Sequence, residues 1–251
     1  MDRLDAGAIA LPGIEVRVVE RCSSTNVVLR DAGKADVLLA AEEQTAGRGR
    51  RGRRWHCAPR AGVTFSLART TRRPLAELAG LSLVAGLGAA RALRALGATR
   101  VALKWPNDLV IGGAKLGGIL VETRGNGRGA LAVIGIGINC RRDAALESRL
   151  RRPVASLDQH IEVDRNRVIA AVGAGVLQAL AAFEAQGLEP LCAEWEAMDA
   201  HAGEQVRVRL ADGRVVSGVA RGLAADGALR LQTRAGVRAL RSAQVLSARP
   251  A

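Results

Sequence analysis

Two short segments of the chain hold most of the residue types that could do chemistry. Only three of its 37 cationic side chains are Lys, and two of these, Lys104 and Lys115, lie within residues 104–122. Because the chain uses Arg for almost every other cation, a Lys at these positions indicates that a compact ammonium group is needed there. The second segment, residues 47–55, is rich in Arg and Gly and ends at Trp55, one of three Trp residues. We therefore expect the functional site to be built from these two segments.

The segment Gly-Arg-Gly-Arg-Arg-Gly-Arg-Arg-Trp at residues 47–55, called the Arg loop below, is typical of an anion-binding loop. Its glycines let backbone amides approach an anion, and guanidinium groups match carboxylate and phosphate oxygens. Trp55 could cover a flat base by stacking. The arginines expected to neutralise the anion are Arg48, Arg50, Arg51 and Arg53. Two alternatives stay open at this point, a solvated basic loop and a nucleic-acid-binding patch.

The Arg loop also matches G-x-G-x-x-G, the signature of a dinucleotide-binding turn. That signature needs a helix directly after the glycines and an acidic residue about 20 positions later. Here a Pro-containing segment and a strand follow the glycines, and no Asp or Glu appears before Glu77. The sequence therefore argues against a dinucleotide site.

The lysine segment suits a reaction at phosphate. We expect Lys104 and Lys115 on adjacent strands, before and after Asn107, Asp108 and a two-glycine turn at residues 112–113, so that both point into one cleft. Asn107 and Asp108 could also hold Mg²⁺ through oxygen. Glycines at positions 117 and 118 remove side chains where a ligand could lie against the backbone. The alternative is a surface hairpin whose charges face water.

Residues 134–139 place glycine at every second position of an expected strand, so that one face carries no side chain. That bare face could form a flat slot for a ring. Close packing against a neighbouring element explains the pattern slightly better when the segment is taken alone. The hydroxyls of Ser24 and Thr25 have two interpretations as well, helix capping or contact with a polar ligand.

The composition, 49% hydrophobic over 251 residues, indicates a full core in one domain or in a large domain plus a small one. The longest apolar stretch, near residues 78–90, is too short for a spanning helix, and the N-terminus does not resemble a secretory signal. We expect no membrane span and a cytoplasmic location. The four Cys lack a C-x-x-C pair and the three His lack metal-ligand spacing, so we expect no bound transition metal.

The net charge of +13 makes nucleic acid an obvious partner to consider, but the charge is unevenly placed. Residues 44–76 contain nine Arg and no acid, and residues 203–251 contain nine Arg and three acids. This distribution indicates a concentrated anion site and a basic small domain.

Hydrophobic periodicity predicts the elements that position these motifs. Strands are expected at 37–41, 63–67, 101–103, 109–111, 116–122 and 131–138, and helices at 27–31, 75–96, 166–186 and 189–198. After a boundary near 199–203, short alternating strands predict a small β-barrel. We therefore divide the chain into a domain at residues 1–200 and a second at 201–251.

Taken together, these motifs resemble those of the biotin protein ligase family, in order and with plausible spacing. The matching segments are Ser-Thr-Asn at 24–26, Gln-Thr-Ala-Gly-Arg-Gly-Arg-Arg-Gly-Arg-Arg-Trp at 44–55, Lys-Trp-Pro-Asn-Asp at 104–108, Lys-Leu-Gly-Gly-Ile-Leu-Val-Glu at 115–122 and Gly-Ile-Gly-Ile-Asn at 135–139. The resemblance implies an α+β fold: a mixed-sheet catalytic domain of the biotin/lipoate ligase type with helices packed on the sheet, followed by a small SH3-like β-barrel.

The resemblance further implies a two-step reaction with ATP and Mg²⁺, in which biotin becomes biotinyl-5′-adenylate and is then transferred to a lysine of a biotin carboxyl carrier protein, the subunit of acetyl-CoA carboxylase. It implies catalytic roles for Lys115, Arg48 and Asp108. The residues implied for biotin are Ser24, Thr25, Asn26, Gln44, Arg48, Gly49, Arg50, Lys115 and Gly117. Those implied for ATP are Arg50, Arg51, Arg53, Trp55, Lys104, Asn107 and Asn139.

Only about two dozen residues precede Ser24, too few for the DNA-binding helix-turn-helix of repressor-type members, so we expect a ligase without sequence-specific DNA binding. Two rival functions are considered. One is a lipoate or octanoate ligase of the same fold, which would have no use for a polar pocket at Ser24, Thr25 and Gln44. The other is a nucleic-acid-binding protein built around the Arg loop, which would leave the retained lysines unexplained.

Overall fold

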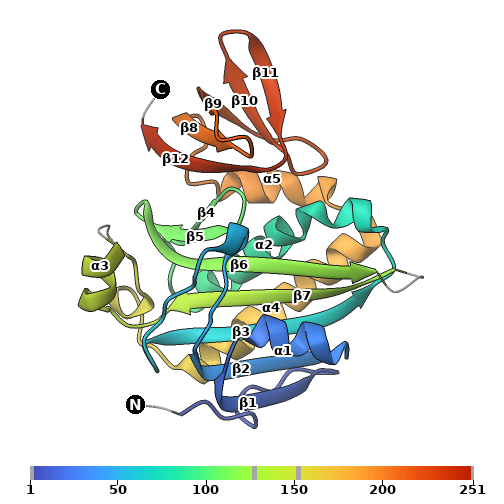
Figure 1. Ribbon diagram of the computed structural model, residues 1–251, viewed down its shortest axis with the longest axis vertical. Helices are drawn as coiled ribbons and strands as arrows, with labels where there is room; N and C mark the ends of the chain where they lie inside the picture. Colours follow the sequence, from blue (N-terminus) through green and yellow to red (C-terminus); the bar gives the residue numbers. More distant parts are fainter. Residues whose placement is uncertain (1–2, 126–128, 151–153, 250–251) are drawn as a thin grey trace.

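A seven-stranded mixed sheet forms the body of the computed structural model, which describes residues 3–125, 129–150 and 154–249 (Figure 1). The strand order is β1-β2-β3-β7-β6-β5-β4. β1 and β2 run parallel, and the other neighbours are antiparallel. The strands are β1 (Glu15–Cys22), β2 (Val37–Gln44), β3 (Gly62–Thr71), β4 (Ala102–Lys104), β5 (Asp108–Ile111), β6 (Ala114–Gly125) and β7 (Ala130–Asn139). The predicted mixed-sheet fold is confirmed.

Helices cover both faces of this sheet. On one face lies α1 (Thr25–Ala32), the crossover between the parallel strands, which ends at Gly33 with a left-handed φ of 65°. On the other face lie α2 (Leu81–Ala95), which continues a 3₁₀ turn at Leu75–Gly80, and α4 (Arg165–Gln186), as Figure 1 shows. Two shorter helices are α3 (Ala144–Leu150) and α5 (Glu189–Ala197). The predicted helices are confirmed, whereas β1 and α3 were not predicted.

Two helical segments, Leu75–Ala95 and Arg165–Gln186, are long and apolar enough to cross a membrane by length and composition. Both segments are longer than the apolar stretch near residues 78–90 on which the sequence prediction rests, because the 3₁₀ turn runs directly into α2 and because α4 is apolar over most of its length. In the structure the two segments pack against each other, and 67% and 39% of their apolar windows are buried inside the molecule. Burial against the sheet accounts for the apolar composition of α2.

Glycine determines how closely α2 and α4 approach. A Cβ atom added at Gly88 would lie 2.5 Å from the carbonyl oxygen of Gly175, and one added at Gly175 would lie 2.5 Å from the carbonyl oxygen of Gly88. Real Cβ atoms do not approach an oxygen so closely, so the two backbones touch only because both residues lack a side chain.

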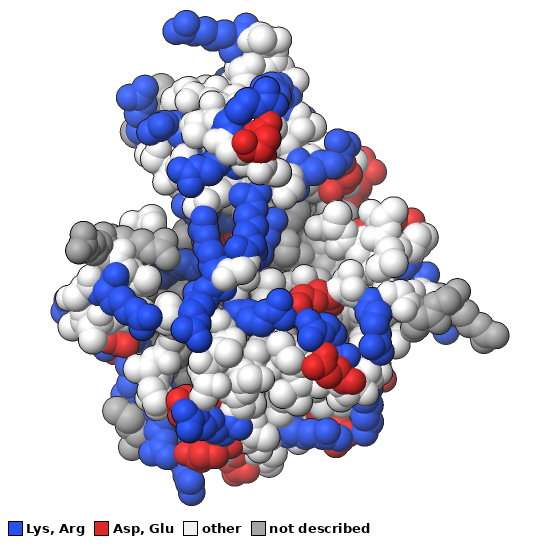
Figure 2. Space-filling view, viewed as in Figure 1, with Lys and Arg blue, Asp and Glu red and all other residues white. Residues whose placement is uncertain are grey.

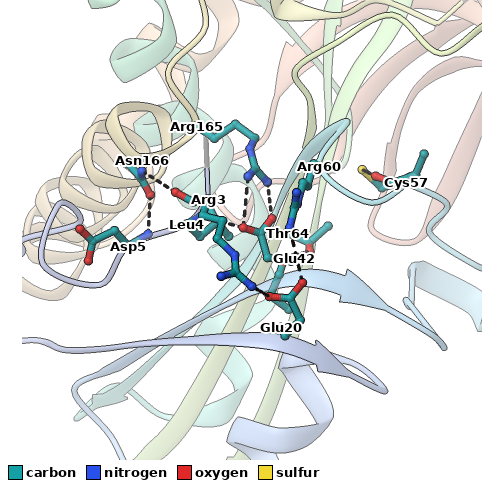
Figure 3. A network of polar contacts seen from close by, with 12 residues as sticks. Arg3, Leu4, Asp5, Glu20, Glu42, Cys57, Arg60, Thr64, Arg165 and Asn166 are labelled. Carbon is teal, nitrogen blue, oxygen red and sulfur yellow. Dashed lines mark hydrogen bonds and ion pairs between the residues drawn. The ribbon is translucent and has the colours of Figure 1, made fainter. Parts of the chain in front are cut away.

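A buried ion pair fastens the N-terminal segment to β2 and α4 (Figure 3). Arg165 pairs with Glu42 at 2.6 Å, and their side chains are 1% and 4% exposed. The amide of Leu4 donates to the same carboxylate at 2.7 Å. Burial opposes ionisation of Glu42, but the hydrogen bonds from Arg165 and Leu4 outweigh it and hold its pKa below the usual range. Because a buried charge is costly without its partner, the pair ties three distant segments together.

The C-terminal strands form a second, five-stranded antiparallel sheet, in the order β11-β10-β9-β8-β12. They are β8 (Gln205–Leu210), β9 (Val215–Leu223), β10 (Leu229–Thr233), β11 (Gly236–Leu240) and β12 (Ala243–Arg249). Val206, Val208 and Leu231 face its core as predicted, but Val215 and Val237, which follow the same pattern, are 43% and 59% exposed. The division of the chain into domains at residue 200 stays a prediction.

The small sheet is joined to the large one at β4. Leu103 of β4 exchanges backbone hydrogen bonds with the linker, donating to Met198 and accepting from Ala200, both at 2.7 Å. The indole of Trp105 is 3% exposed and donates to the carbonyl of Gly227 at 3.1 Å. The linker and the turn between β9 and β10 therefore contact the large sheet beside the lysine segment.

We predict that Gly88→Ala destabilises the protein by about 1–3 kcal/mol, because the added methyl group overpacks the contact between α2 and α4. Helix propensity alone predicts the opposite sign, a gain of about 1 kcal/mol. Urea unfolding of the wild type and the variant measures the difference. An unchanged or increased free energy of unfolding would contradict the close contact at Gly88.

Candidate functional site

A cleft opens where one end of the large sheet, the Arg loop and strand β12 meet. Its walls include the following predicted site residues: Ser24, Thr25, Asn26, Gln44, Arg48, Gly49, Arg50, Arg51, Arg53, Trp55, Lys104, Asn107, Asp108, Lys115 and Asn139. They come from segments more than 100 positions apart in the chain. The structure therefore brings the predicted motifs together in one place.

The exception is Gly117. A Cβ atom at Gly117 would lie 2.6 Å from the carbonyl oxygen of Gly137, between neighbouring strands, so this residue faces away from the cleft. The glycine in the cleft wall is Gly118, where an added Cβ atom would lie 3.2 Å from Lys115 Nζ. A register shift between β5 and β6 precedes this point, and simple alternation along the strand does not predict which glycine faces inward.

The floor of the cleft is neutral and polar. Thr25 donates from its backbone amide to Gln44 Oε1 at 2.8 Å, and its hydroxyl lies 2.7 Å from Ser66 Oγ. Ser66 Oγ donates to Asn26 Oδ1 at 2.6 Å. Ser24 precedes α1 but makes no capping hydrogen bond through its side chain with the residues that the structure describes. Its hydroxyl therefore lines the cleft instead of closing the helix, which favours the ligand-contact interpretation.

The two lysines meet at the other end of the cleft, although they do not lie on adjacent strands as predicted. Strand β5, which begins at Asp108, lies between β4 and β6. Lys115 Nζ donates to Asp108 Oδ1 at 2.5 Å and lies 5.8 Å from the ring centroid of Trp55. Lys104 and Asp108 pair across the tight turn between β4 and β5. The ammonium group of Lys115 is thus held by a carboxylate and an aromatic ring.

Asn107 and Asn139 hold the backbone of the cleft in place. The amide of Asn107 donates to Ile119 O at 2.7 Å, and that of Asn139 donates to Ala155 O at 3.1 Å and Lys115 O at 3.3 Å. Asn107 Oδ1 also accepts a hydrogen bond from Arg50 at 3.4 Å. Both side chains therefore position the segments that carry the lysines.

The Arg loop folds back on itself. Gly49 N donates to Arg53 O at 2.7 Å, and Trp55 N donates to Gly47 O at 3.0 Å. Arg51 lies at the tip with a left-handed φ of 57°. Residues Arg50–Gly52 of the loop form a 3₁₀ turn, and the next strand, β3, begins at Gly62. Within the described residues, the helix that a dinucleotide-binding turn requires directly after its glycines is not formed here.

The arginines of the loop point in several directions. Arg48 donates to Glu122 at 3.2 Å, at the rim of the polar floor. Arg50 points toward the lysine end, and burial, together with the neighbouring Arg51, lowers its pKa. Figure 2 shows Lys and Arg side chains gathered at the centre of this face, below the small sheet, where the tip of the Arg loop lies in Figure 1. Several of the cations expected from the charge placement therefore line one cleft, and anion binding there stays a prediction.

Two arginines of the loop reach the small sheet, which the sequence did not predict. Arg51 donates to Ser242 Oγ at 3.4 Å, and Arg53 donates to Gln244 Oε1. Gln244 and its neighbours on β12 form part of the cleft wall. No sequence signal pointed to these residues, because they lie 191 positions from their partners in a segment with no motif.

Side chains of the protein pack against the glycines of β7. A Cβ atom at Gly137 would lie 2.4 Å from the indole of Trp55, and one at Gly135 would lie 2.2 Å from Asn26 Oδ1. These contacts favour the close-packing interpretation, although both glycines also line the cleft. Trp55 Nε1 is buried and has no hydrogen-bond partner among the described residues.

Metal ligation and cysteine chemistry find little support in this site. Within the described residues, no three His, Cys, Asp or Glu side chains gather as a metal-ligand set. The oxygens of Asn107 and Asp108 already accept hydrogen bonds from Arg50 and Lys115. Cys57, beside the Arg loop, is a poor nucleophile because burial raises the pKa of its thiol to about 12.

The chain matches two protein families. One is the biotin/lipoate A/B protein ligase family, over residues 18–139, and the other is the biotin protein ligase C-terminal domain, over residues 201–246. It is 38% identical over 238 residues to the bifunctional ligase/repressor BirA of Escherichia coli, which covers 92% of this chain and 71% of that protein. It is 36% identical over 230 residues to the biotin–[acetyl-CoA-carboxylase] ligase of Mycobacterium tuberculosis, covering 86% and 83% of the two chains.

Solved structures show the same likeness. The biotin protein ligase from Aquifex aeolicus in complex with biotin and ATP has a TM-score of 0.80 and 26% identity, with 94% of this chain and 99% of that chain covered.

We predict that Gly137→Val displaces Trp55 from β7 and opens the cleft wall, because the added side chain would overlap the indole ring. Tryptophan fluorescence should shift to longer wavelength as this ring becomes exposed, and the shift should be lost when Trp55→Phe is added. A Gly137→Val spectrum identical to that of the wild type would contradict the packing of Trp55 on this strand.

Proposed function

The chain belongs to the biotin protein ligase family, and on that premise we propose that it activates biotin with ATP and transfers it to a lysine of a biotin carboxyl carrier protein. The observation that carries this proposal is the arrangement of the cleft. A neutral polar floor at Thr25 and Gln44 lies at one end, and cations at Lys115 and Arg50 lie at the other. A ligand with a polar uncharged head and a carboxylate tail fits this distribution.

In the first step, a carboxylate oxygen of biotin attacks the α-phosphorus of ATP, and the bond from that phosphorus to the bridging oxygen of pyrophosphate breaks. The obstacle is the repulsion between two anions. Lys115, Arg48 and Arg50 would offset it, because all three cations line the same cleft. Lys115 would bridge carboxylate and α-phosphate oxygens, and its hydrogen bond to Asp108 fixes where its charge lies.

The nucleotide would occupy the part of the cleft bounded by the Arg loop and β12. We propose that Trp55 and Asn139 contact adenine and that Arg51, Arg53, Lys104 and Asn107 lie along the phosphates. Mg²⁺ would arrive with ATP and neutralise phosphate charge, because the oxygens of Asn107 and Asp108 are already engaged by cations of the protein. The Arg loop would cover the adenylate and keep water from hydrolysing it.

In the second step, the amine of the carrier lysine attacks the carbonyl carbon of the mixed anhydride, and AMP leaves. The amine must be neutral to attack. Asp108, 24% exposed at the cleft, would orient this amine or accept its proton. Because Asp108 also holds Lys115, it would link the two steps.

The rival functions are less well supported. A fatty acyl or lipoyl chain offers nothing to hydrogen-bond with Thr25 and Gln44, so the polar floor favours biotin over the other substrates of the fold. A nucleic-acid-binding role would leave the pairing of Lys115 with Asp108 without a purpose. That the protein does not bind an operator stays a prediction, which a gel-shift assay tests; the cytoplasmic location and the identity of the carrier are likewise proposals.

We predict that Lys115→Ala lowers biotin-dependent exchange of labelled pyrophosphate into ATP by about 100-fold or more, because a preorganised cation is lost from the reacting centre. The matched control is Lys34→Ala, since Lys34 is the third lysine and forms a surface ion pair with Glu15. Normal pyrophosphate exchange in Lys115→Ala would show that another cation stabilises the charge at the reacting centre.

We predict that Asp108→Asn slows transfer from preformed biotinyl-adenylate to the carrier by at least about tenfold more than it slows pyrophosphate exchange, because general-base assistance is typically worth 10²–10⁴-fold. Single-turnover measurements of each step make the comparison. Asp212→Asn, at a surface turn, is the control. Equal losses in both steps would mean that Asp108 acts through Lys115 rather than on the acceptor amine.

A further inference from the structure

Four side chains form one continuous chain of hydrogen bonds across the floor of the cleft. It runs from Glu122 on β6 to Asn26 on α1, then to Ser66 on β3 and Thr25 on α1, and the backbone amide of Thr25 extends it to Gln44 on β2. Neither Glu122 nor Ser66 was among the site residues predicted from the sequence. Ser66 is fully buried behind the cleft wall, and Glu122 stands at its rim.

The direction of the first hydrogen bonds is fixed by chemistry. Glu122 accepts hydrogen bonds from Arg30 at 3.3 Å and Arg48 at 3.2 Å, and because a guanidinium group can only donate, its carboxyl group is the acceptor end of the chain. The Nδ2 group of Asn26 donates to Glu122 Oε2 at 2.9 Å and to Leu120 O at 3.3 Å. Two acceptors therefore set the orientation of this amide, so that Asn26 Oδ1 faces Ser66.

The remaining directions follow in turn. Asn26 Oδ1 cannot donate, so Ser66 gives its single hydrogen to it, at 2.6 Å. Ser66 Oγ must then accept at its 2.7 Å contact with Thr25, which gives up its own hydrogen. The other acceptor in reach of the Thr25 hydroxyl is Gln44 Oε1 at 3.2 Å. Both acceptors lie inside the protein, so Thr25 presents lone pairs to the cleft.

Gln44 presents the opposite character. Its Oε1 is occupied by the amide of Thr25 at 2.8 Å, which leaves Nε2 turned toward the Arg loop beside Gly47. The floor thus offers a fixed acceptor at Thr25 and a fixed donor at Gln44. A cyclic urea, which carries N–H donors and a carbonyl acceptor, complements this pair, whereas a dithiolane ring or an alkyl chain does not.

We propose that Glu122 and Ser66 are positioning residues that select the ureido head of the substrate by setting the direction of this hydrogen-bond chain. The proposal rests on the proposed function, because it assumes that the polar end of the cleft receives the head of biotin. Glu122 acts at a distance through Asn26 and Ser66, and it touches the Arg loop through Arg48.

The test compares biotin with an analogue in which one ureido N–H is replaced by oxygen, giving a cyclic carbamate. Biotin-dependent pyrophosphate exchange gives KM and kcat for each acid in the wild type, Ser66→Ala and Glu122→Gln. Ser66→Ala cuts the chain without touching Arg48, and Glu122→Gln supplies an amide that can donate to Asn26 and invert it. Arg30→Gln is the matched control, since it removes a partner of Glu122 that lies outside the chain.

In both test variants we expect KM for biotin to rise about three- to tenfold, which is the range for one neutral hydrogen bond. In Ser66→Ala kcat should change little, whereas Glu122→Gln also weakens the contact with Arg48 and should lower kcat as well. The preference for biotin over the carbamate should shrink by a similar factor, and Arg30→Gln should keep the wild-type preference. If either variant does not fold, judged by thermal unfolding, the other decides.

Three outcomes count against the proposal. A wild-type preference in a folded Ser66→Ala or Glu122→Gln would overturn it, as would a wild-type enzyme that uses both acids equally well. A loss in kcat alone, with KM and preference unchanged, would also overturn it. A wild-type protein that forms no biotinyl-adenylate at all would instead refute the proposed function, so the two failures are distinguishable.

Discussion

The constraint on which the site depends is a pair of glycines on one face of strand β7. Gly135 and Gly137 of β7 allow Asn26 and Trp55 to approach the backbone more closely than any Cβ atom would permit. Asn26 then joins the polar floor, and Trp55 stands beside the ammonium group of Lys115. The neutral end and the charged end of the cleft are therefore both built on the same strand.

The cleft has neutral hydrogen-bonding groups at one end and cations at the other, and the two kinds of group recognise different parts of a ligand. Neutral hydrogen-bonding groups keep their directionality inside the protein, where they recognise an uncharged head by shape and by donor pattern. Cations act over longer range and favour anions of many shapes. In the proposed function, the end at Thr25 and Gln44 would select the substrate, and the end at Lys115 and Arg50 would promote the reaction. The buried ion pair of Arg165 and Glu42, in contrast, anchors the N-terminal segment to β2 and α4.

The sequence predicts most of this fold because its strands and helices have strong periodicity and clear ends, such as Gly33 after α1. β1 is harder to predict from the sequence. It is an edge strand that is exposed along much of its length, so apolar and polar residues alternate only weakly in it. The motif residues are predictable because Lys, Trp and clustered Gly are unusual in this chain. Ser66 is not, because a serine between Phe65 and Leu67 looks like an ordinary strand residue until its partners from α1 are in place. Gln244 and Ser242 become visible only once folding brings positions 191 residues apart into contact.

The hydrogen bond from Trp105 to Gly227 couples the position of the small sheet to the position of the cleft wall. Trp105 lies in the short turn between β4, which ends at Lys104, and β5, which begins at Asp108, so the turn has little freedom to change its conformation. A rotation of the small sheet would either break the hydrogen bond between Trp105 and Gly227 or move the turn between β4 and β5. A load applied to the C-terminal strands would therefore be passed on to the turn between Lys104 and Asp108, which forms part of the cleft wall.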